Sequence, residues 1–392
     1  MLGLTGRLVL ALALAAGAPG AAEAADPGER DLRVPLPPQP AGVPWPDEAW
    51  PEAEPGPGVD RAALAAALER AFSAVGRAGV PDTRAFLVVQ RGAIVAERYA
   101  PGFGRATRFH SWSMAKSVTQ ALVGILVSQG RLALDAPAPV PAWHADGDPR
   151  RVLTLSHLLH MTSGLDNADD RGGEGPTSLV AHMLFGREAR DQSAYAASFP
   201  LARGPDSHWA YSTATSNILA AIVQRAAGGS QEDMLRFLRS ELLEPLGMRG
   251  AVAEFDAAGT FMGGGFFWAS ARDWARFGYL YLRDGAWDGR RILPEGWVDY
   301  TRTPAPAPDN GAHTAHFWVN REPAEGQFRL LPRGPESAFS ATGANGQFVL
   351  MVPTHDLLVV RLGEMQSTSW EEVQEPLAQV IEAFPPLPAE SG

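Results

Sequence analysis

Two strand-rich segments lie near opposite ends of this 392-residue chain. The first has apolar runs at 85–89 and 93–99 around a Gln-Arg-Gly turn, and the second has runs at 347–352 and 357–362 around a proline turn. β-rich runs that flank a short turn predict hairpins. Sheet strands from both ends, with a helical insertion at about 131–260 between them, favour one composite α+β unit over two independent domains.

Helical patterns occupy much of the remaining chain. Apolar residues at helical spacing predict an amphipathic helix over 59–76, and Ser270 to Asp273 resembles a capping box that begins another helix. Further helices are predicted over 113–129, 154–161, 215–227 and 369–384, and no convincing strand over about 131–260. The predicted fold is therefore an antiparallel sheet flanked by helices, with a mostly helical inserted subdomain.

The first 24 residues have the pattern of a targeting segment. Arg7 precedes an apolar run over 8–16, and Ala22-Glu23-Ala24 ends a stretch of small residues. This predicts a secretory signal peptide cleaved near Ala24, because the apolar run is too short to span a bilayer; an uncleaved anchor is the alternative. We therefore expect a periplasmic or secreted protein, with no transmembrane segment in the mature chain.

Residues 25–58 are rich in proline, which excludes helix or central strand and predicts an extended arm before the main domain at 59–392. Trp45 and Trp50 are unusual in a linker. They either pin this arm to the domain or lie on a free tether.

Composition limits the chemistry. Without cysteine, the chain has no disulfide, thiol nucleophile, iron–sulfur centre or thiolate zinc site. A net charge of −11 without a basic run argues against a nucleic-acid or anionic-membrane partner. The histidine pairs 157/160 and 313/316 have no accompanying metal motif, so we expect structural or surface histidines, and neither a metal nor a cofactor.

Lys116 is the only lysine among 33 basic residues, and it follows Ser113 by three positions in a segment otherwise free of charge. In a helix this spacing puts the hydroxyl and the amine on one face, one turn apart. Burial lowers the pKa of an amine, so a buried lysine can take the proton of a serine, whereas arginine cannot be deprotonated. The backbone N–H of Ser113 lies in the first turn, where the helix dipole favours a developing oxyanion.

Chance is the competing explanation. Serine precedes a lone lysine at this spacing at roughly its own frequency, about one in twenty, so the four-residue motif is weak by itself. The surroundings favour catalysis, because a charged group in an uncharged helix is costly. We therefore interpret Ser113 as a nucleophile and Lys116 as its base.

Several further stretches accompany this motif: 109–117, 158–165, Tyr211-Ser212-Thr213, 263–265 through 278, and 341–347. In this order they make residues from about 59 to 385 resemble the β-lactamase-related serine hydrolases, close to class C β-lactamases, their esterase relatives and the 6-aminohexanoate-dimer hydrolases. The resemblance implies the β-lactamase/DD-peptidase fold, with Ser113 as the acylated nucleophile and Lys116 as its general base.

The resemblance also implies roles for other residues. Tyr211 matches the tyrosine of the Tyr-x-Asn element, which relays the proton between lysine, serine and leaving group, and a neighbouring cation is expected to hold its pKa down. Residues 341–343 correspond to the third motif of the family. Thr342 and Gly343 are thus implied substrate contacts, and the N–H of Ala344 is the second oxyanion donor.

Two departures from the family pattern affect the expected substrate. Thr213, an implied substrate contact, stands where the family often has asparagine, which alters a partner of a substrate amide or of the lysine. Ala341 replaces the cationic or histidine residue that helps β-lactamases hold the substrate carboxylate. We therefore expect a hydrolase of an ester or small amide rather than a β-lactamase or D-alanyl-D-alanine carboxypeptidase. A non-catalytic penicillin-binding or sensor module is a further alternative, and the oligomeric state is not indicated.

Overall fold

A computed structural model of the chain describes residues 35–73, 82–173, 177–307, 312–322, 329–365 and 370–388. Its main sheet has six strands in the order β2-β1-β11-β10-β9-β8, and each neighbouring pair is antiparallel. In that order the strands are Ala93–Tyr99, Asp82–Gln90, Leu357–Glu364, Gln347–Val352, Phe339–Gly343 and Trp318–Val319. Both predicted hairpins are present, and β1 pairs directly with β11, which confirms that the two ends of the chain share one sheet.

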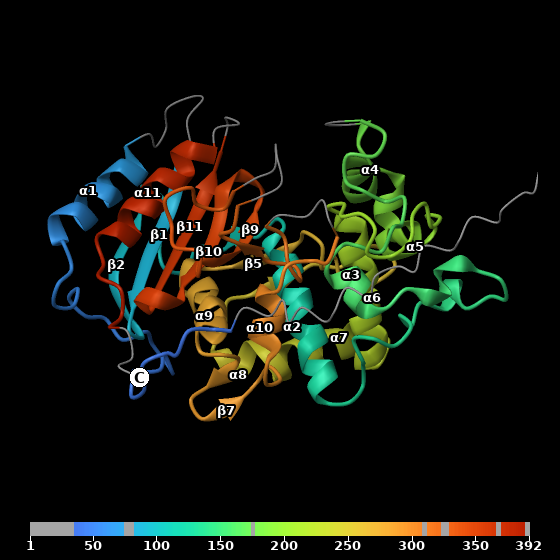
Figure 1. Ribbon diagram of the computed structural model, residues 1–392, viewed down its shortest axis with the longest axis horizontal. Coiled ribbons are helices and arrows are strands. Elements are labelled where there is room, and N and C mark those ends of the chain that lie inside the picture. The colour runs from blue at the N-terminus through green and yellow to red at the C-terminus, as the bar shows by residue number, and fades with distance from the viewer. Residues whose placement is uncertain are drawn as a thin grey trace, which may run out of the picture. The chain divides into compact units, whose positions relative to one another are not determined.

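Helices cover both faces of this sheet (Figure 1). On one face, alternate strand residues such as Phe86 and Phe348 pack with α1 (Arg61–Phe72) and α11 (Trp370–Glu382). On the other face, residues such as Leu87 and Val349 pack with α2 (Met114–Ser128) and α9 (Ala271–Leu282). The period of two in the strands therefore sends side chains into two separate cores.

The part between the hairpins is mostly helical, as predicted. It contains η1 (Pro141–Trp143), η2 (Pro149–Val152), α3 (Leu155–Leu159), α4 (Leu179–Phe185), η4 (Arg187–Arg190), α5 (Gln192–Ala197), α6 (Thr213–Ala227), α7 (Gln231–Leu238), η5 (Arg239–Leu243) and α8 (Glu244–Leu246). Ser270 and Asp273 form the predicted capping box of α9. Three further elements, β6 (Ala286–Trp287), β7 (Arg290–Arg291) and α10 (Trp297–Arg302), follow α9.

The prediction of no strand over 131–260 is wrong at one place. β4 (Val252–Ala253) pairs with β5 (Phe267–Ala269), which also pairs with β3 (Phe109–His110). A strand of two residues shows no alternation that a sequence pattern could reveal. This small sheet matters because β3 leads directly into the segment that carries Ser113.

Helix α2 is buried along most of its length, as its lack of charge predicts. Its polar side chains are satisfied internally: Ser117 Oγ donates to the His316 carbonyl at 2.8 Å, and Thr119 Oγ1 donates to the Gly263 carbonyl at 3.0 Å. Buried hydroxyls with partners avoid the cost of desolvation. α2 is therefore a fixed support for the residues at its N-terminal end.

The described part of the proline-rich arm lies on the domain. Trp50 is buried, and its Nε1 donates to the Arg272 carbonyl at 3.0 Å. The Trp45 ring contacts Tyr279, with ring centroids 5.4 Å apart. Of the two alternatives for this arm, the docked one is present. The predicted signal segment lies outside the described residues.

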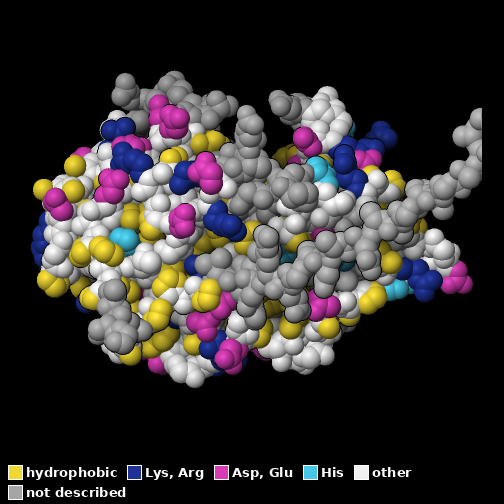
Figure 2. All heavy atoms as spheres, in the orientation of Figure 1, with side chains coloured by type: hydrophobic (Ala, Val, Ile, Leu, Met, Phe, Trp, Pro, Cys, Tyr) yellow, Lys and Arg dark blue, Asp and Glu magenta, His cyan; other side chains and the backbone are white. Residues whose placement is uncertain are grey.

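No helix within the described ranges is both long and apolar enough to cross a membrane. On the face in Figure 2, acidic and basic side chains are interspersed rather than gathered by sign.

Candidate functional site: a serine–lysine pair at the start of α2

Ser113 lies at the N-terminal end of α2, immediately after a strained residue. Trp112 has φ of 47°, in the left-handed region that bulky side chains rarely adopt. The preceding residue is tied to β5, because Ser111 N donates to the Phe267 carbonyl at 2.8 Å and Phe267 N donates to Ser111 Oγ at 3.2 Å. Such strain costs on the order of 1–3 kcal/mol and is maintained only where the surroundings enforce it. The turn therefore holds Ser113 in one orientation.

Lys116 lies one helical turn after Ser113, and its side chain is almost completely buried. Its Nζ donates to the Gly264 carbonyl at 2.6 Å, to Thr213 Oγ1 at 2.9 Å and to Ser113 Oγ at 3.1 Å. Burial lowers the pKa of Lys116 to about 8, against the opposing effect of the Asp169 carboxylate. The amine can therefore lose its proton near neutral pH, within reach of the serine hydroxyl.

Tyr211 precedes α6 and lies half-buried beside this pair. Lys116 Nζ lies 5.1 Å from the centroid of the Tyr211 ring, and the Tyr211 hydroxyl is hydrogen-bonded to Ser113. Burial and the Asp169 carboxylate raise the pKa of Tyr211, only partly opposed by the bond to Ser113. The expectation that a cation holds this pKa down is therefore wrong, because the lysine is itself buried and a carboxylate lies nearby. With this raised pKa, Tyr211 stays protonated and neutral near physiological pH.

Thr213 and Asp169 complete the group around the amine. Thr213 N donates to Asp169 Oδ1 and Thr213 Oγ1 donates to Asp169 Oδ2, both at 2.6 Å. Thr213 Oγ1 is also a hydrogen-bond partner of Lys116 Nζ, at 2.9 Å. Asp169 is absent from the sequence-based predictions, because Asp166, Asp169 and Asp170 lie together in one loop and nothing in the pattern distinguishes them.

The glycine run after β4 supplies the carbonyl that holds Lys116. A Cβ on Gly264 would lie 2.8 Å from Thr213 Cγ2 and 2.9 Å from Asn217 Oδ1. Gly264 N donates to Asn217 Oδ1 at 2.8 Å, which fixes this peptide against α6. Only glycine allows the backbone to approach α6 and the lysine so closely.

The C-terminal end of β9 lies next to the turn that precedes Ser113. A Cβ on Gly343 would lie 2.3 Å from the Ser111 carbonyl oxygen, so glycine is required where this strand passes the turn before Ser113. Ala344, the predicted oxyanion donor, follows directly as the first residue of η6 (Ala344–Gly346). Ala341 is fully buried in the core on the α2 face.

The side chain of Thr342, predicted to contact substrate, lies on the face of the sheet opposite to α2. It pairs with Phe348 across the β9–β10 ladder, and Phe348 belongs to the core on the face that carries α1 and α11. Residues directly opposite in an antiparallel pair share a face. The Thr342 side chain therefore points away from α2, and this strand meets the site through its neighbours.

The histidines have structural surroundings. His316 is buried, with its ring bonded to Ser216 Oγ at 2.8 Å and to the Leu159 carbonyl at 2.7 Å, and burial lowers its pKa to about 3. His157 takes part in the capping box of α3. Within the described ranges, no group of three or more His, Asp or Glu side chains is placed to hold a metal ion.

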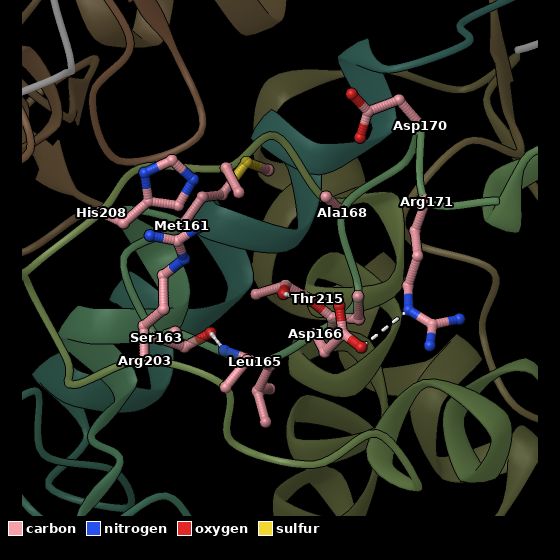
Figure 3. Close-up of a pocket in the computed structure, with 14 residues that line it drawn as sticks. Met161, Ser163, Leu165, Asp166, Ala168, Asp170, Arg171, Arg203, His208 and Thr215 are labelled. Carbon is pink, nitrogen blue, oxygen red and sulfur yellow. Dashed lines mark hydrogen bonds and ion pairs between the residues drawn. The ribbon is translucent and has the colours of Figure 1, made fainter. Parts of the chain in front are cut away.

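A hollow of about 250 Å³ lies beside the loop that carries Asp169 (Figure 3). Its lining includes Met161, Asp170, Arg203 and His208, and an Asp166–Arg171 ion pair of 2.9 Å at one side. Ser113, Lys116 and Tyr211 do not line it. The hollow is thus a neighbour of the serine–lysine site rather than its binding cleft.

A serine and a buried lysine thus lie at the start of one helix, which packs against an antiparallel sheet. The family model described as Beta-lactamase matches residues 65–379, and the chain belongs to this family of serine hydrolases. It is 25% identical over 309 residues to a 6-aminohexanoate-dimer hydrolase of Paenarthrobacter ureafaciens, covering 74% of this chain and 73% of that protein.

A further relative is similar in sequence, and a solved structure is similar in fold. Esterase EstB of Burkholderia gladioli is 31% identical over 213 residues, which cover 49% of this chain and 52% of that protein. The crystal structure of a penicillin-binding protein homologue from Caulobacter crescentus superposes with a TM-score of 0.62 at 19% identity, covering 83% of this chain and 99% of that one. The predicted β-lactamase-like α+β fold is confirmed.

Proposed function

We propose that the protein hydrolyses an ester or a small amide through an acyl-enzyme on Ser113. The observation that carries this proposal is the 3.1 Å contact between Ser113 Oγ and the buried Lys116 Nζ. A lysine whose pKa is lowered to about 8 is partly neutral at physiological pH and can act as a general base.

The proposed reaction proceeds in two halves. Lys116 takes the hydroxyl proton of Ser113, and Oγ attacks the substrate carbonyl carbon. The N–H groups of Ser113 and Ala344 are proposed to stabilise the resulting oxyanion. The proton then passes through Lys116 and Tyr211 to the leaving group, which departs as alcohol or amine. In the second half, Lys116 accepts a proton from the water that attacks the acyl carbon. It returns this proton to Ser113 Oγ as the acyl–oxygen bond breaks, so that free Ser113, neutral Lys116 and a carboxylic acid result.

The alanine at position 341 in β9 supports the choice of substrate class. At position 341, where β-lactamases place a cation or histidine near the substrate carboxylate, this chain has a fully buried alanine. A site that lacks this charge binds a penicillin carboxylate less tightly. An esterase and a 6-aminohexanoate-dimer hydrolase among the relatives agree with an ester or small amide.

We also propose that the protein is exported and that the signal segment at 1–24 is removed near Ala24. Support for this comes from the charge and apolar pattern of the segment alone. Mass spectrometry of the protein recovered from the periplasm or the medium tests it: a mature N-terminus within a few residues of Ala25 is expected, and an intact Met1 terminus contradicts it.

A substrate panel tests the proposed reaction. Purified protein and a Ser113→Ala variant are assayed with p-nitrophenyl acetate and butyrate, with a p-nitroanilide and with nitrocefin. Turnover of an ester or anilide that the variant lacks is expected. Nitrocefin turnover exceeding ester turnover would favour a β-lactamase, and no turnover of any substrate would favour the non-catalytic alternative.

A further inference from the structure

Asp169 is a half-buried carboxylate with no place in the reaction above. It lies in the loop after α3, and both of its oxygens accept hydrogen bonds of 2.6 Å from Thr213, one from the backbone N–H and one from the hydroxyl. Burial raises its pKa, and the nearby ammonium group of Lys116 opposes this. A charge held inside the protein beside the base is costly unless it is paired.

The hydroxyl of Thr213 has a defined polarity for this reason. A hydroxyl has one hydrogen to donate, and Thr213 donates it to Asp169 Oδ2. Towards Lys116 Nζ, 2.9 Å away, Thr213 Oγ1 therefore presents only lone pairs. Gly264 offers the amine a carbonyl oxygen at 2.6 Å, which is also purely an acceptor.

These two acceptors determine how a neutral Lys116 is oriented. A neutral amine has two N–H donors and one lone pair. When the donors point to Thr213 Oγ1 and the Gly264 carbonyl, the lone pair points to the third neighbour, Ser113 Oγ, at 3.1 Å. A general base requires this geometry, with its lone pair aimed at the proton it removes.

We propose that Asp169 is a positioning residue: by taking the hydroxyl hydrogen of Thr213, it makes Thr213 an acceptor and so aims the lone pair of neutral Lys116 at Ser113. The inference rests on the proposed function, because it concerns the base of that reaction. It also accounts for the threonine at position 213, since a hydroxyl that donates its hydrogen to the carboxylate can only accept a hydrogen bond from Lys116.

Asp169→Asn is the direct test. The asparagine oxygen can still accept from Thr213 N, but its NH₂ group then faces Thr213 Oγ1 and becomes the donor. The hydroxyl hydrogen turns towards Lys116 and competes for the lone pair. We expect kcat for the ester to fall by about 10- to 100-fold with KM changed by less than about twofold, as for a misdirected base.

Asp170→Asn is the matched control. It removes the same charge one residue away, from a side chain that lines the hollow in Figure 3, whereas Thr213 bonds to Asp169. We expect kcat within about twofold of the unmodified protein. Equal values of kcat for the two variants would overturn the proposal.

The pH profile separates positioning from a merely structural effect. The charged and titratable groups around Lys116 are Asp169, Tyr211, His313 and His316. Asp169 favours the ammonium form, so its removal lowers the pKa of Lys116 further. Asp169→Asn should therefore shift the midpoint of the kcat profile to lower pH while the plateau falls, and Asp170→Asn should shift neither. A lower plateau with an unmoved midpoint contradicts the proposal.

Substitutions at Thr213 provide the second readout. Thr213→Val keeps the shape but removes the hydroxyl and should lower kcat as Asp169→Asn does, while Thr213→Ser should keep most of the activity. In the Thr213→Val background, Asp169→Asn should lower kcat by less than a further factor of about three. If the two losses in kcat were fully additive, the proposal would be overturned. If Asp169→Asn does not fold, the comparison of Thr213→Val with Thr213→Ser tests the proposal instead. Equal kcat values for these two variants would overturn the proposal. Absence of turnover in the unmodified protein would instead refute the proposed function.

Discussion

Replacement of Lys116 by arginine separates the role of its proton from the role of its charge. Lys116→Arg keeps a cation on the same turn of α2 but removes the ability to lose a proton, because arginine stays protonated in proteins. The lysine has a pKa lowered to about 8, so about half of it is neutral at pH 8. An arginine with a pKa above about 12 is neutral in fewer than about one molecule in 10⁴ at that pH.

The expected loss follows from these fractions. General-base catalysis contributes about 10²- to 10⁴-fold, so kcat/KM for p-nitrophenyl acetate at pH 8 should fall by at least about 10²-fold. The larger guanidinium in a fully packed site also costs about 1–3 kcal/mol of stability, which urea unfolding measures. Lys116→Met, neutral and similar in length, is the control for charge and should be equally inactive. A folded Lys116→Arg variant with kcat/KM within tenfold of the unmodified protein would show that lysine is not the base.

Three further predictions concern the same framework. Acylation should rise with pH as Lys116 loses its proton, about fivefold from pH 7 to 8 and less than about twofold from 8 to 9; stopped-flow burst rates check this, and continued tenfold increases beyond pH 9 would contradict it. Gly343→Ala should push the Ser111 carbonyl away and lower kcat more than about tenfold, whereas an unchanged kcat would show that the contact does not position Ser113. Trp50→Ala should lower the free energy of unfolding by about 3–5 kcal/mol in urea, and a loss below about 1 kcal/mol would mean that the arm does not support the fold.

Much of the fold could be predicted because its patterns are local. The runs that form β1, β2, β10 and β11 have strong β preference around short turns, and α2 has no charged residue besides Lys116. The sharing of one sheet by the two ends of the chain was predicted, whereas the direct pairing of β1 with β11 was not, since the sequence does not specify which strands are neighbours. The two-residue strands β3, β4 and β8 could not be predicted, since tertiary pairing alone defines them.

The residues of the candidate site were likewise predictable only where their contacts are local in the sequence. Ser113 and Lys116 were predictable because their spacing within one helix places them together. Asp169 was not, because its contact with Thr213 joins residues 44 apart in the sequence. The pKa of Tyr211 was predicted in the wrong direction for the same reason, since Asp169 contributes to raising it. Thr342 shows a further limit: a motif names a residue, but the register of β9 decides which face its side chain takes.

The most direct test of the central claim is to find the residue that becomes acylated. The protein is incubated at pH 8 with a fluorophosphonate probe, digested, and the labelled peptide is located by mass spectrometry, with Lys116→Arg treated in parallel. We predict one adduct, on Ser113, that forms at least about 10²-fold more slowly in the variant. An adduct on another serine, or equal labelling rates in the two proteins, would contradict a mechanism in which Lys116 activates Ser113.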